Sequence, residues 1–455
     1  MSAPDPLPSL LIAVPAVILA CHAGAALVRR LGQPPVIGEI ATGILLGPSL
    51  FGWLWPDAQQ WLFPSSIAPF TSVLGQLGLL AFMFLVGLEL DLNALRGHSR
   101  TAVAVSQASV LLPLALGSLL ALAMFGTLSP PGVDRLPFVL FIAVSMSVTA
   151  FPVLARILTD RNLYGTPTGA LAMACAAVDD VTAWCLLAVV VAVGSSESAL
   201  GALTSAALTV VFVLLMFKVV RPVLARLAAR ASGAGDGAVL VLLFSGLCLA
   251  ALATDELGVH ALFGAFLFGV VTPRGSGDVE RSAARLRAVA VPLLLPLFFV
   301  HTGMKTDLAL LAADPEQWLW AGAVLVVAVA GKFGGSTLAA RVTGRSWRQS
   351  ATIGALMNCR GLTELVVLNI GLELGVIGPG LFTILVLMAL VTTAATAPVV
   401  SWLRHEDPDG PADGAPGARP GGTEPAAAAG TEPAATSAAG SAADAAASEG
   451  VLSRR

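Results

Sequence analysis

Long apolar segments recur along almost the whole chain, and they limit what it can fold into. A helix that crosses the hydrocarbon core of a membrane needs about 20 mostly apolar residues, or fewer where protein covers part of it. The sequence predicts thirteen such spans, at 8–28, 35–52, 69–90, 101–125, 136–158, 167–193, 199–220, 238–254, 257–273, 288–304, 317–340, 350–373 and 379–403. Because no long segment alternates apolar and polar residues, the pattern favours helices over a barrel.

The composition agrees with a protein that lies in lipid. Hydrophobic residues make up 56% of the chain and charged residues 12%, whereas about a quarter of the residues of a soluble domain are charged. A soluble enzyme, a nucleic-acid binder and a disordered protein are therefore excluded. The sequence predicts an all-α polytopic membrane protein that lies in the lipid bilayer.

The end of the chain differs from the rest. Residues 404–455 consist mainly of Ala, Gly, Pro, Glu, Ser and Thr. Such a segment cannot bury enough apolar surface to offset its ordering entropy, so we expect a disordered tail. The cysteines stand singly at 21, 175, 185, 248 and 359, a pattern that supports neither a disulfide framework nor a bound metal, and nothing in the sequence indicates a cofactor.

Basic residues are concentrated in alternate loops. The loops on one side carry Arg29, Arg30, Arg96, Arg100, Arg161, Lys218, Arg221, Arg226, Arg230, Arg274, Arg281, Arg285, Arg287, Arg341, Arg345, Arg348 and Arg404, whereas the opposite loops carry Arg135 and Lys305. Since basic loops remain in the cytoplasm, we expect an odd number of spans, with the N-terminus outside and the tail cytoplasmic. Arg29 and Arg30 follow the first span, which favours a retained helix over a cleaved signal peptide.

Two of the spans contain features that interrupt a helix. The segment 136–158 includes Ser147, Thr149 and Pro152, and the segment 350–373 includes Asn358, Arg360 and Gly361. Proline removes a backbone donor, and a polar cluster at mid-span accompanies a broken helix. A pair of interrupted helices at matching places in two halves indicates an inverted-repeat transporter with its site at the midplane.

Adjacent carboxylates lie inside one span. Asp179 and Asp180 have about nine mostly apolar residues on either side, where an ionised group costs roughly 2.5–3.5 kcal/mol. Adjacent helical residues point about 100° apart, so one carboxylate can face a hydrated cavity while the other pairs with protein. A cation and a proton compete for the oxygens of such a group. We therefore expect Asp180 to be the shared site and the ligand of a transported metal cation.

The other charged residues inside the spans are expected to pair with or support this site. Lys332, at the middle of its span, should pair with Asp179 in a switchable or a purely structural ion pair. Arg360 and Glu364 have i, i+4 spacing, so they can pair along one face or cap the two half-helices. Glu39 is a packing residue or lines the ion path. Ser147, Thr149 and Asn358 offer oxygen ligands near the breaks, although membrane serines and threonines more often bond a backbone carbonyl.

Several segments in series resemble a known family. They are Leu31–Ile40, Gly43–Pro48, Phe84–Asp91, Thr149–Arg156, Ala177–Trp184, Leu295–Phe299 with Gly303, Gly331–Lys332 and Met357–Glu364. In this order the chain resembles the monovalent cation:proton antiporter superfamily, in the branch of bacterial Kef-type and plant CHX-type exchangers. The resemblance runs from the second span to the twelfth.

The resemblance implies a fold of about 13 helices with an inverted repeat and two crossing interrupted helices. It implies a dimerisation part at about 1–95 and 238–305, a moving core part at about 100–195 and 315–403, and a linker helix at about 199–224. It also implies a homodimer in the cell membrane with an elevator-like motion. In the electrogenic members the motif has two adjacent aspartates, and the second binds the ion. Here these match Asp179 and Asp180, with Lys332 as the core lysine, so the resemblance favours electrogenic exchange.

From these observations we expect a secondary active antiporter that exchanges Na⁺ or K⁺ for protons, and not an enzyme. Asp180, Asp179, Lys332, Thr149 and Ser147 would bind ion or proton, supported by Arg360, Glu364, Asn358 and Pro152. The polar tail carries no GxGxxG motif after a strand, which argues against nucleotide gating. The alternatives are a potassium-selective electroneutral exchanger, a K⁺ efflux channel, an intramembrane aspartyl protease and a transporter of organic solutes. No TVGYG segment favours the channel. The protease would need two aspartates on separate helices, whereas Asp179 and Asp180 are adjacent.

Overall fold

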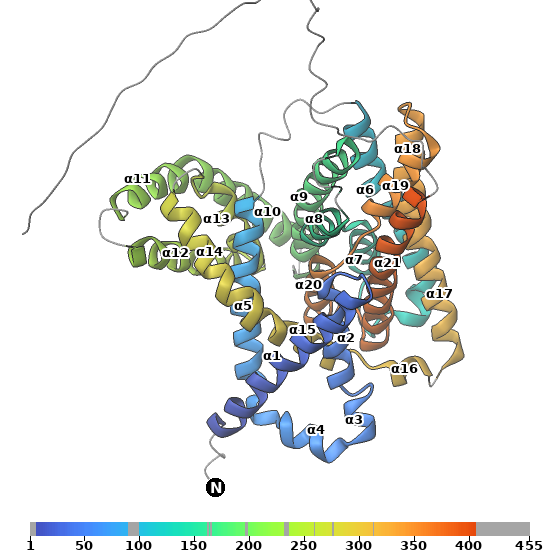
Figure 1. Ribbon diagram of the computed structural model, residues 1–455, viewed down its shortest axis with the longest axis horizontal. Coiled ribbons are helices and arrows are strands. Elements are labelled where there is room, and N and C mark those ends of the chain that lie inside the picture. Colours follow the sequence, from blue (N-terminus) through green and yellow to red (C-terminus); the bar gives the residue numbers. More distant parts are fainter. Residues whose placement is uncertain are drawn as a thin grey trace, which may run out of the picture. The chain divides into compact units, whose positions relative to one another are not determined.

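The structure is a computed structural model that describes residues 6–89, 100–161, 163, 166–195, 199–231, 236–258, 260–274, 277–312 and 314–405. These residues form helices and connecting turns, with no strand among them (Figure 1). The prediction that residues 404–455 are a disordered tail falls, from residue 406 onward, outside the described part. The last described helix, α21 (Pro379–His405), ends two residues beyond the predicted boundary of its span.

The predicted spans are found as helices, with one difference in length. Eleven helices in the described ranges are long and apolar enough to cross a membrane, or up to twelve if a bent pair counts as one span. The bent pair is α19 (Trp347–Met357) with α20 (Leu362–Glu373), at 44°. The expected span at 257–273 contains only α13 (Ala261–Val271), which has 11 residues. At a rise of about 1.5 Å per residue this helix is too short to cross the bilayer by itself.

A first group of helices packs together although its members come from two distant parts of the chain. The helix α5 lies against α13 and α15, α2 lies between α1 and α15, and α12 contacts α13 and α14. The bounds are α1 (Leu7–Arg30), α2 (Pro35–Leu46), α5 (Ala68–Glu89), α12 (Asp236–Glu256), α14 (Gly277–Val289), the π-helical turn η4 (Ala290–Leu294) and α15 (Leu295–Met304). The short helices α3 (Phe51–Leu54), α4 (Pro56–Leu62) and η1 (Ser65–Ile67) connect α2 to α5.

A second group forms around α6, α9 and α21. The helix α6 contacts α7, α9 and α18, while α21 contacts α17, α19 and α20 (Figure 1). The bounds are α6 (Arg100–Leu128), α7 (Arg135–Ser147), α8 (Phe151–Asp160), α9 (Pro167–Ser195), α17 (Pro315–Val329), the π-helical turn η5 (Ala330–Gly334) and α18 (Gly335–Val342). The remaining helices connect the two groups in the sequence. They are α10 (Ala199–Leu215), the π-helical turn η2 (Met216–Val220), α11 (Arg221–Ala231) and α16 (Leu308–Ala312). That the two groups act as a dimerisation part and a moving core stays a prediction.

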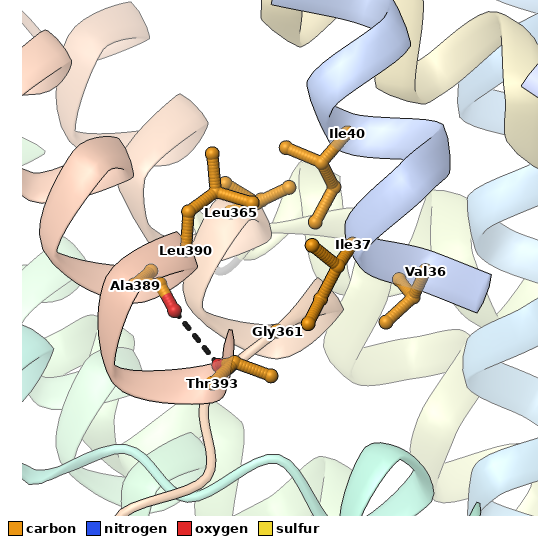
Figure 2. Close-up of a pocket in the computed structure, with 8 residues that line it drawn as sticks. All are labelled: Val36, Ile37, Ile40, Gly361, Leu365, Ala389, Leu390 and Thr393. Carbon is orange, nitrogen blue, oxygen red and sulfur yellow. Dashed lines mark hydrogen bonds between the residues drawn. The ribbon is translucent and has the colours of Figure 1, made fainter. Parts of the chain in front are cut away.

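The contact between the two groups is apolar at its centre. Figure 2 shows residues of α2 that face residues of α20 and α21 across a pocket of about 10 Å³, a space for one water at most. The lining residues are Val36, Ile37, Ile40, Gly361, Leu365, Ala389, Leu390 and Thr393. Thr393 Oγ1 donates to the carbonyl of Ala389 in its own helix, so its hydroxyl group is satisfied without a partner across the contact. The centre of this contact is therefore nearly free of polar bonds between the groups.

Polar bonds join the two groups near the ends of the helices. At the end with the basic loops, Gln33 Nε2 donates to the Ala394 carbonyl at 3.0 Å, and Arg161 Nη2 donates to the Gly32 carbonyl at 3.0 Å. At the other end, Lys305 Nζ donates to Asn369 Oδ1 at 3.1 Å, and Asn369 Nδ2 donates to Thr302 Oγ1 at 2.9 Å. The polar contacts between the groups thus lie at the two ends of the helices, and the apolar contacts lie at the centre.

Within the first group, α2 and α15 approach so closely that only glycine fits at their crossing. A Cβ atom at Gly303 would lie 2.1 Å from the carbonyl carbon of Gly43, and one at Gly43 would lie 2.4 Å from the carbonyl oxygen of Phe299. Small residues at helix contacts in membranes allow this close backbone approach.

We therefore expect Gly303→Ala to destabilise the protein by about 1–3 kcal/mol, because two backbones must separate to admit one methyl group. Gly322→Ala is the matched control, since a Cβ atom there meets nothing within 4 Å, and alanine is the better helix former by about 1 kcal/mol. Thermal unfolding in detergent measures both variants. Equal melting temperatures for the two would contradict the close crossing.

Candidate functional site

The two interrupted helices cross at their breaks. The helix α7 ends at Ser147 and α8 begins at Phe151, while α19 ends at Met357 and α20 begins at Leu362. The Ala150 N–H donates to the Cys359 carbonyl at 3.1 Å, which joins one break to the other. Pro152 lies in the first turn of α8, where its missing N–H leaves no helical bond unmade. Both predicted interruptions are confirmed.

Arg360 joins three parts of this crossing. Its Nη1 atom donates to Glu364 Oε2 at 2.9 Å and to the Ser145 carbonyl at 2.9 Å, and its Nη2 atom donates to the Met146 carbonyl at 2.6 Å. The two carbonyls belong to the last turn of α7, where a helix leaves acceptors unpaired and favours positive charge. The sequence left open whether Arg360 pairs with Glu364 or caps a half-helix, and in the structure it does both.

Glu364 completes the arrangement from the first turn of α20. It accepts from Ser145 Oγ at 2.6 Å as well as from Arg360, and both members of the ion pair are fully buried. Thr393 of α21 holds the Arg360 backbone, since its Oγ1 accepts from the Arg360 N–H at 3.0 Å. The crossing is thus fixed by buried bonds among α7, α20 and α21.

The second buried pair joins Asp179 and Lys332, as predicted. Lys332 Nζ lies 3.6 Å from Asp179 Oδ2, and both side chains have no exposed surface. Thr149, in the first break, lies between them: its hydroxyl group accepts from Lys332 Nζ and donates to Asp179 Oδ2 at 3.0 Å. The break in the first interrupted helix therefore supplies a group that couples the carboxylate to the ammonium.

Two serines of α6 complete the surroundings of Asp179. Ser106 Oγ donates to Asp179 Oδ1 at 2.9 Å, and Ser109 Oγ donates to Oδ2. The approach of α6 depends on Gly331, next to Lys332 in the π-helical turn, where a Cβ atom would lie 3.0 Å from Pro113 Cα. Neither serine is among the site residues predicted from the sequence. Their i, i+3 spacing in an apolar helix was the available signal, but nothing in the sequence indicates that α6 faces α9.

Asp180 differs from its neighbour. Its side chain is buried, yet its Oδ1 atom has no hydrogen-bond partner among the described residues. The same is true of Nε1 of Trp184, one helical turn further along α9. A buried polar atom without a partner costs about 1–3 kcal/mol. Asp179 accepts hydrogen bonds from three hydroxyl groups and faces the ammonium group of Lys332. Of the two adjacent carboxylates, Asp180 is therefore the one with an oxygen that lacks a hydrogen bond to any described residue.

The remaining candidates are more scattered. Ser147 Oγ donates to the Val144 carbonyl of its own helix at 2.8 Å, so Thr149 and not Ser147 is the hydroxyl group bonded to Asp179. Asn358 ends α19, and its Oδ1 atom has no partner within the described chain. Glu39 is half-buried on α2 and is absent from the lining of the pocket between the helix groups. Among the residues expected at the site, the buried oxygens without a hydrogen-bond partner in the described chain are thus Oδ1 of Asp180 and Oδ1 of Asn358.

These features define an all-helical, multi-pass membrane protein in which two broken helices cross beside buried ion pairs. The family model described as "Sodium/hydrogen exchanger, transmembrane" matches residues 16–403. The chain belongs to this family of transporters, within the monovalent cation:proton antiporter superfamily.

Similar proteins carry related names. The chain is 40% identical over 380 residues to the Na⁺/H⁺ antiporter NhaS4 of Synechocystis, and the matched region covers 82% of this chain and 92% of that protein. It is 39% identical over 408 residues to cation/H⁺ antiporter 20 of Arabidopsis thaliana, with 86% of this chain and 48% of that protein covered. It is 33% identical over 406 residues to K⁺/H⁺ antiporter 1 of Saccharomyces cerevisiae, with 87% and 46% covered. The chain therefore spans about half the length of the plant and yeast relatives.

A solved structure supports the same fold. The sodium proton antiporter MjNhaP1 of Methanocaldococcus jannaschii superposes with a TM-score of 0.56 over 87% of this chain and 97% of that chain. The sequence identity is 16%, so this likeness concerns the fold alone.

We expect Arg360→Met to destabilise the protein by about 3–5 kcal/mol, because it leaves the Glu364 carboxylate buried and unpaired. The double variant Arg360→Met with Glu364→Gln should recover part of that loss, since the unpaired charge is gone. Thermal unfolding in detergent measures both.

The matched control is Arg156→Met, which removes another i, i+4 pair, Arg156 with Asp160, whose side chains are 51% and 40% exposed. An exposed pair of this kind contributes about 0.3–0.5 kcal/mol. Similar losses for Arg360→Met and Arg156→Met would contradict a structural role for the buried pair.

Proposed function

We propose that this protein exchanges a monovalent cation, Na⁺ or K⁺, for protons across a membrane, with Asp180 as the group that binds them in turn. The observation that carries the proposal is the buried carboxylate of Asp180, which has an unpartnered oxygen beside a neighbour whose oxygens are satisfied. An isolated carboxylate is not stable inside a bundle. A proton or a cation on Asp180 neutralises it, and the two exclude each other because they take the same oxygens.

The names of the relatives support a cation as the counter-substrate of the proton. Sodium stands in the name of the Synechocystis relative and potassium in that of the yeast relative. Hard cations of this kind prefer oxygen ligands, and Asp180 and Asn358 supply such oxygens.

The pair of Asp179 and Lys332 gives a way to carry a second proton. When a cation enters, Asp179 turns from Lys332 toward it, and the ammonium releases its proton. The proton-loaded site then holds one proton on Asp180 and one on Lys332, whereas the cation-loaded site holds neither. Two protons move in one direction for each cation in the other, so the cycle carries net charge.

Alternating exposure requires the site to move relative to the rest of the protein. The side chains of the site lie on α6, α9, η5 and the first break, all within the second helix group. The contact with the first group is apolar at its centre and polar at its ends. We take the first group to be a scaffold, with a second copy against it, along which the second group slides as an elevator. We place the protein in the plasma membrane, where its basic loops would face the cytoplasm.

Exchange in proteoliposomes with a pH-sensitive dye inside tests the site. Addition of Na⁺, K⁺ or Li⁺ should change the dye signal for at least one cation, and Asp180→Asn should lower the rate to that of empty vesicles. Asp255→Asn, an exposed carboxylate at the end of α12, is the matched control and should retain the rate. Normal exchange by Asp180→Asn would exclude the assignment, and a cation current without proton movement would favour a channel.

The same vesicles test the proposed stoichiometry under a clamped membrane potential. With one net charge moved per cycle, 100 mV should shift the equilibrium cation ratio about 50-fold. Lys332→Gln removes the second proton carrier, so any exchange that it retains should not respond to the potential. An equilibrium ratio in the parent protein that ignores the potential would instead support an electroneutral, potassium-selective exchanger if K⁺ alone is active.

A further inference from the structure

The most spacious cavity of the described pockets lies away from the breaks, between the two helix groups. It has a volume of about 510 Å³ and is bounded by α9, by α10 with η2, and by α12 and α13. Its walls are side chains of valine, leucine, alanine, phenylalanine and tryptophan with Cys185, and Thr209 and Thr254 are the hydroxyl-bearing residues. Thr254 Oγ1 donates to the Ala251 carbonyl at 3.0 Å, so its hydroxyl group is satisfied within its own helix. We call this cavity the α9–α10–α13 groove.

The groove opens on the outer surface of the bundle. Val189, Val210 and Leu214, which line it, are 56%, 59% and 55% exposed. In a multi-pass membrane protein such a surface lies against lipid, and a space with apolar walls takes hydrocarbon in preference to water.

Basic residues follow one end of the groove. Phe217 of η2 lines it, and the next residue, Lys218, is exposed, as is Arg221 at the start of α11. Neither has an ion pair among the described residues. Both lie in the C-terminal half of the apolar helical segment Ala207–Leu227, and basic side chains near the membrane surface attract anionic headgroups.

We propose that the α9–α10–α13 groove binds an acyl chain of an anionic phospholipid whose headgroup lies at Lys218 and Arg221. A second copy of the protein is the less suitable occupant, because a symmetric contact would bring its own Lys218 and Arg221 against the same charges. An acyl chain fills a concave apolar space without presenting any backbone to it.

A lipid in this groove touches the helix that carries Asp180. Trp184, one turn from Asp180, lines the groove and packs edge-on against Phe263 at 5.5 Å between ring centroids and stacks on Phe266 at 6.2 Å. These rings join α9 of the second group to α13 of the first. Occupancy of the groove therefore acts on the contact across which the proposed motion takes place, and anionic lipid should change the exchange rate.

Native mass spectrometry of the full chain in detergent, with phosphatidylglycerol or phosphatidylcholine added, measures the binding directly. The parent protein should retain phosphatidylglycerol in preference, and Lys218→Gln and Arg221→Gln should each lower that preference about fivefold. Arg30→Gln, an exposed arginine at the end of α1, is the control for the loss of one charge and should leave the preference unchanged.

Two tryptophan variants on α10 test the groove itself. Val210→Trp fills it and should abolish the retained lipid, whereas Val211→Trp, at a position 60% exposed that does not line the groove, should keep it. Equal retention by the two variants would overturn the proposal. A change from dimer to monomer in Val210→Trp with unchanged lipid would overturn it in favour of a second copy as the occupant.

The consequence for exchange is tested in vesicles of phosphatidylcholine with and without phosphatidylglycerol. The parent and Val211→Trp should differ in rate between the two lipids, and Val210→Trp should not. A rate that ignores the lipid in the parent protein would remove the regulatory part of the proposal. Absence of exchange in every lipid would contradict the proposed antiport and leave the binding result as it stands, because binding is measured without transport.

Discussion

The structure depends on the burial of charge in an apolar bundle, which requires every buried ion to have a partner. Arg360 meets this requirement with several partners, since it neutralises Glu364 and also caps the carbonyl groups at the end of α7. A broken helix inside a membrane leaves backbone acceptors that water cannot reach. One guanidinium group, with several donors in a fixed plane, satisfies two of these acceptors and a carboxylate together. The buried guanidinium group of Arg360 thus stabilises the crossing of the two broken helices.

The same requirement makes the exception at Asp180 meaningful. Asp179 is bonded to Ser106, Ser109, Thr149 and Lys332, whereas Oδ1 of Asp180 has no partner in the described part of the chain. Two chemically identical neighbours therefore have opposite surroundings, because adjacent positions on a helix face different directions. In this structure the protein's own groups surround the carboxylate of Asp179, whereas an oxygen of Asp180 has no partner among the described residues.

The arrangement of apolar and polar contacts between the helix groups connects the site with the lipid. The contact is apolar at its centre, with hydrogen bonds near its ends, and the α9–α10–α13 groove lies where α9 meets α13. The proposed ion site and the proposed lipid site both lie on α9. The two proposals meet at Asp180 and Trp184, which lie one turn apart.

The sequence by itself determined the class of the protein, the positions of nearly all helices, the two breaks and the buried charges. The reason is that the cost of a polar group in lipid is local: a lysine at position 332 or a proline at 152 has the same consequence whatever surrounds it. The span at 257–273 was predicted too long, because an apolar composition does not reveal where a helix ends.

The tertiary structure decided which groups meet. Arg360 reaches carbonyls 214 and 215 residues away in the chain, and Ser106 reaches a carboxylate 73 residues away. Thr149 rather than Ser147 bonds Asp179 because the break turns one hydroxyl group toward α9 and leaves the other on its own helix. Such pairings depend on the packing of distant helices, which local composition and spacing do not encode.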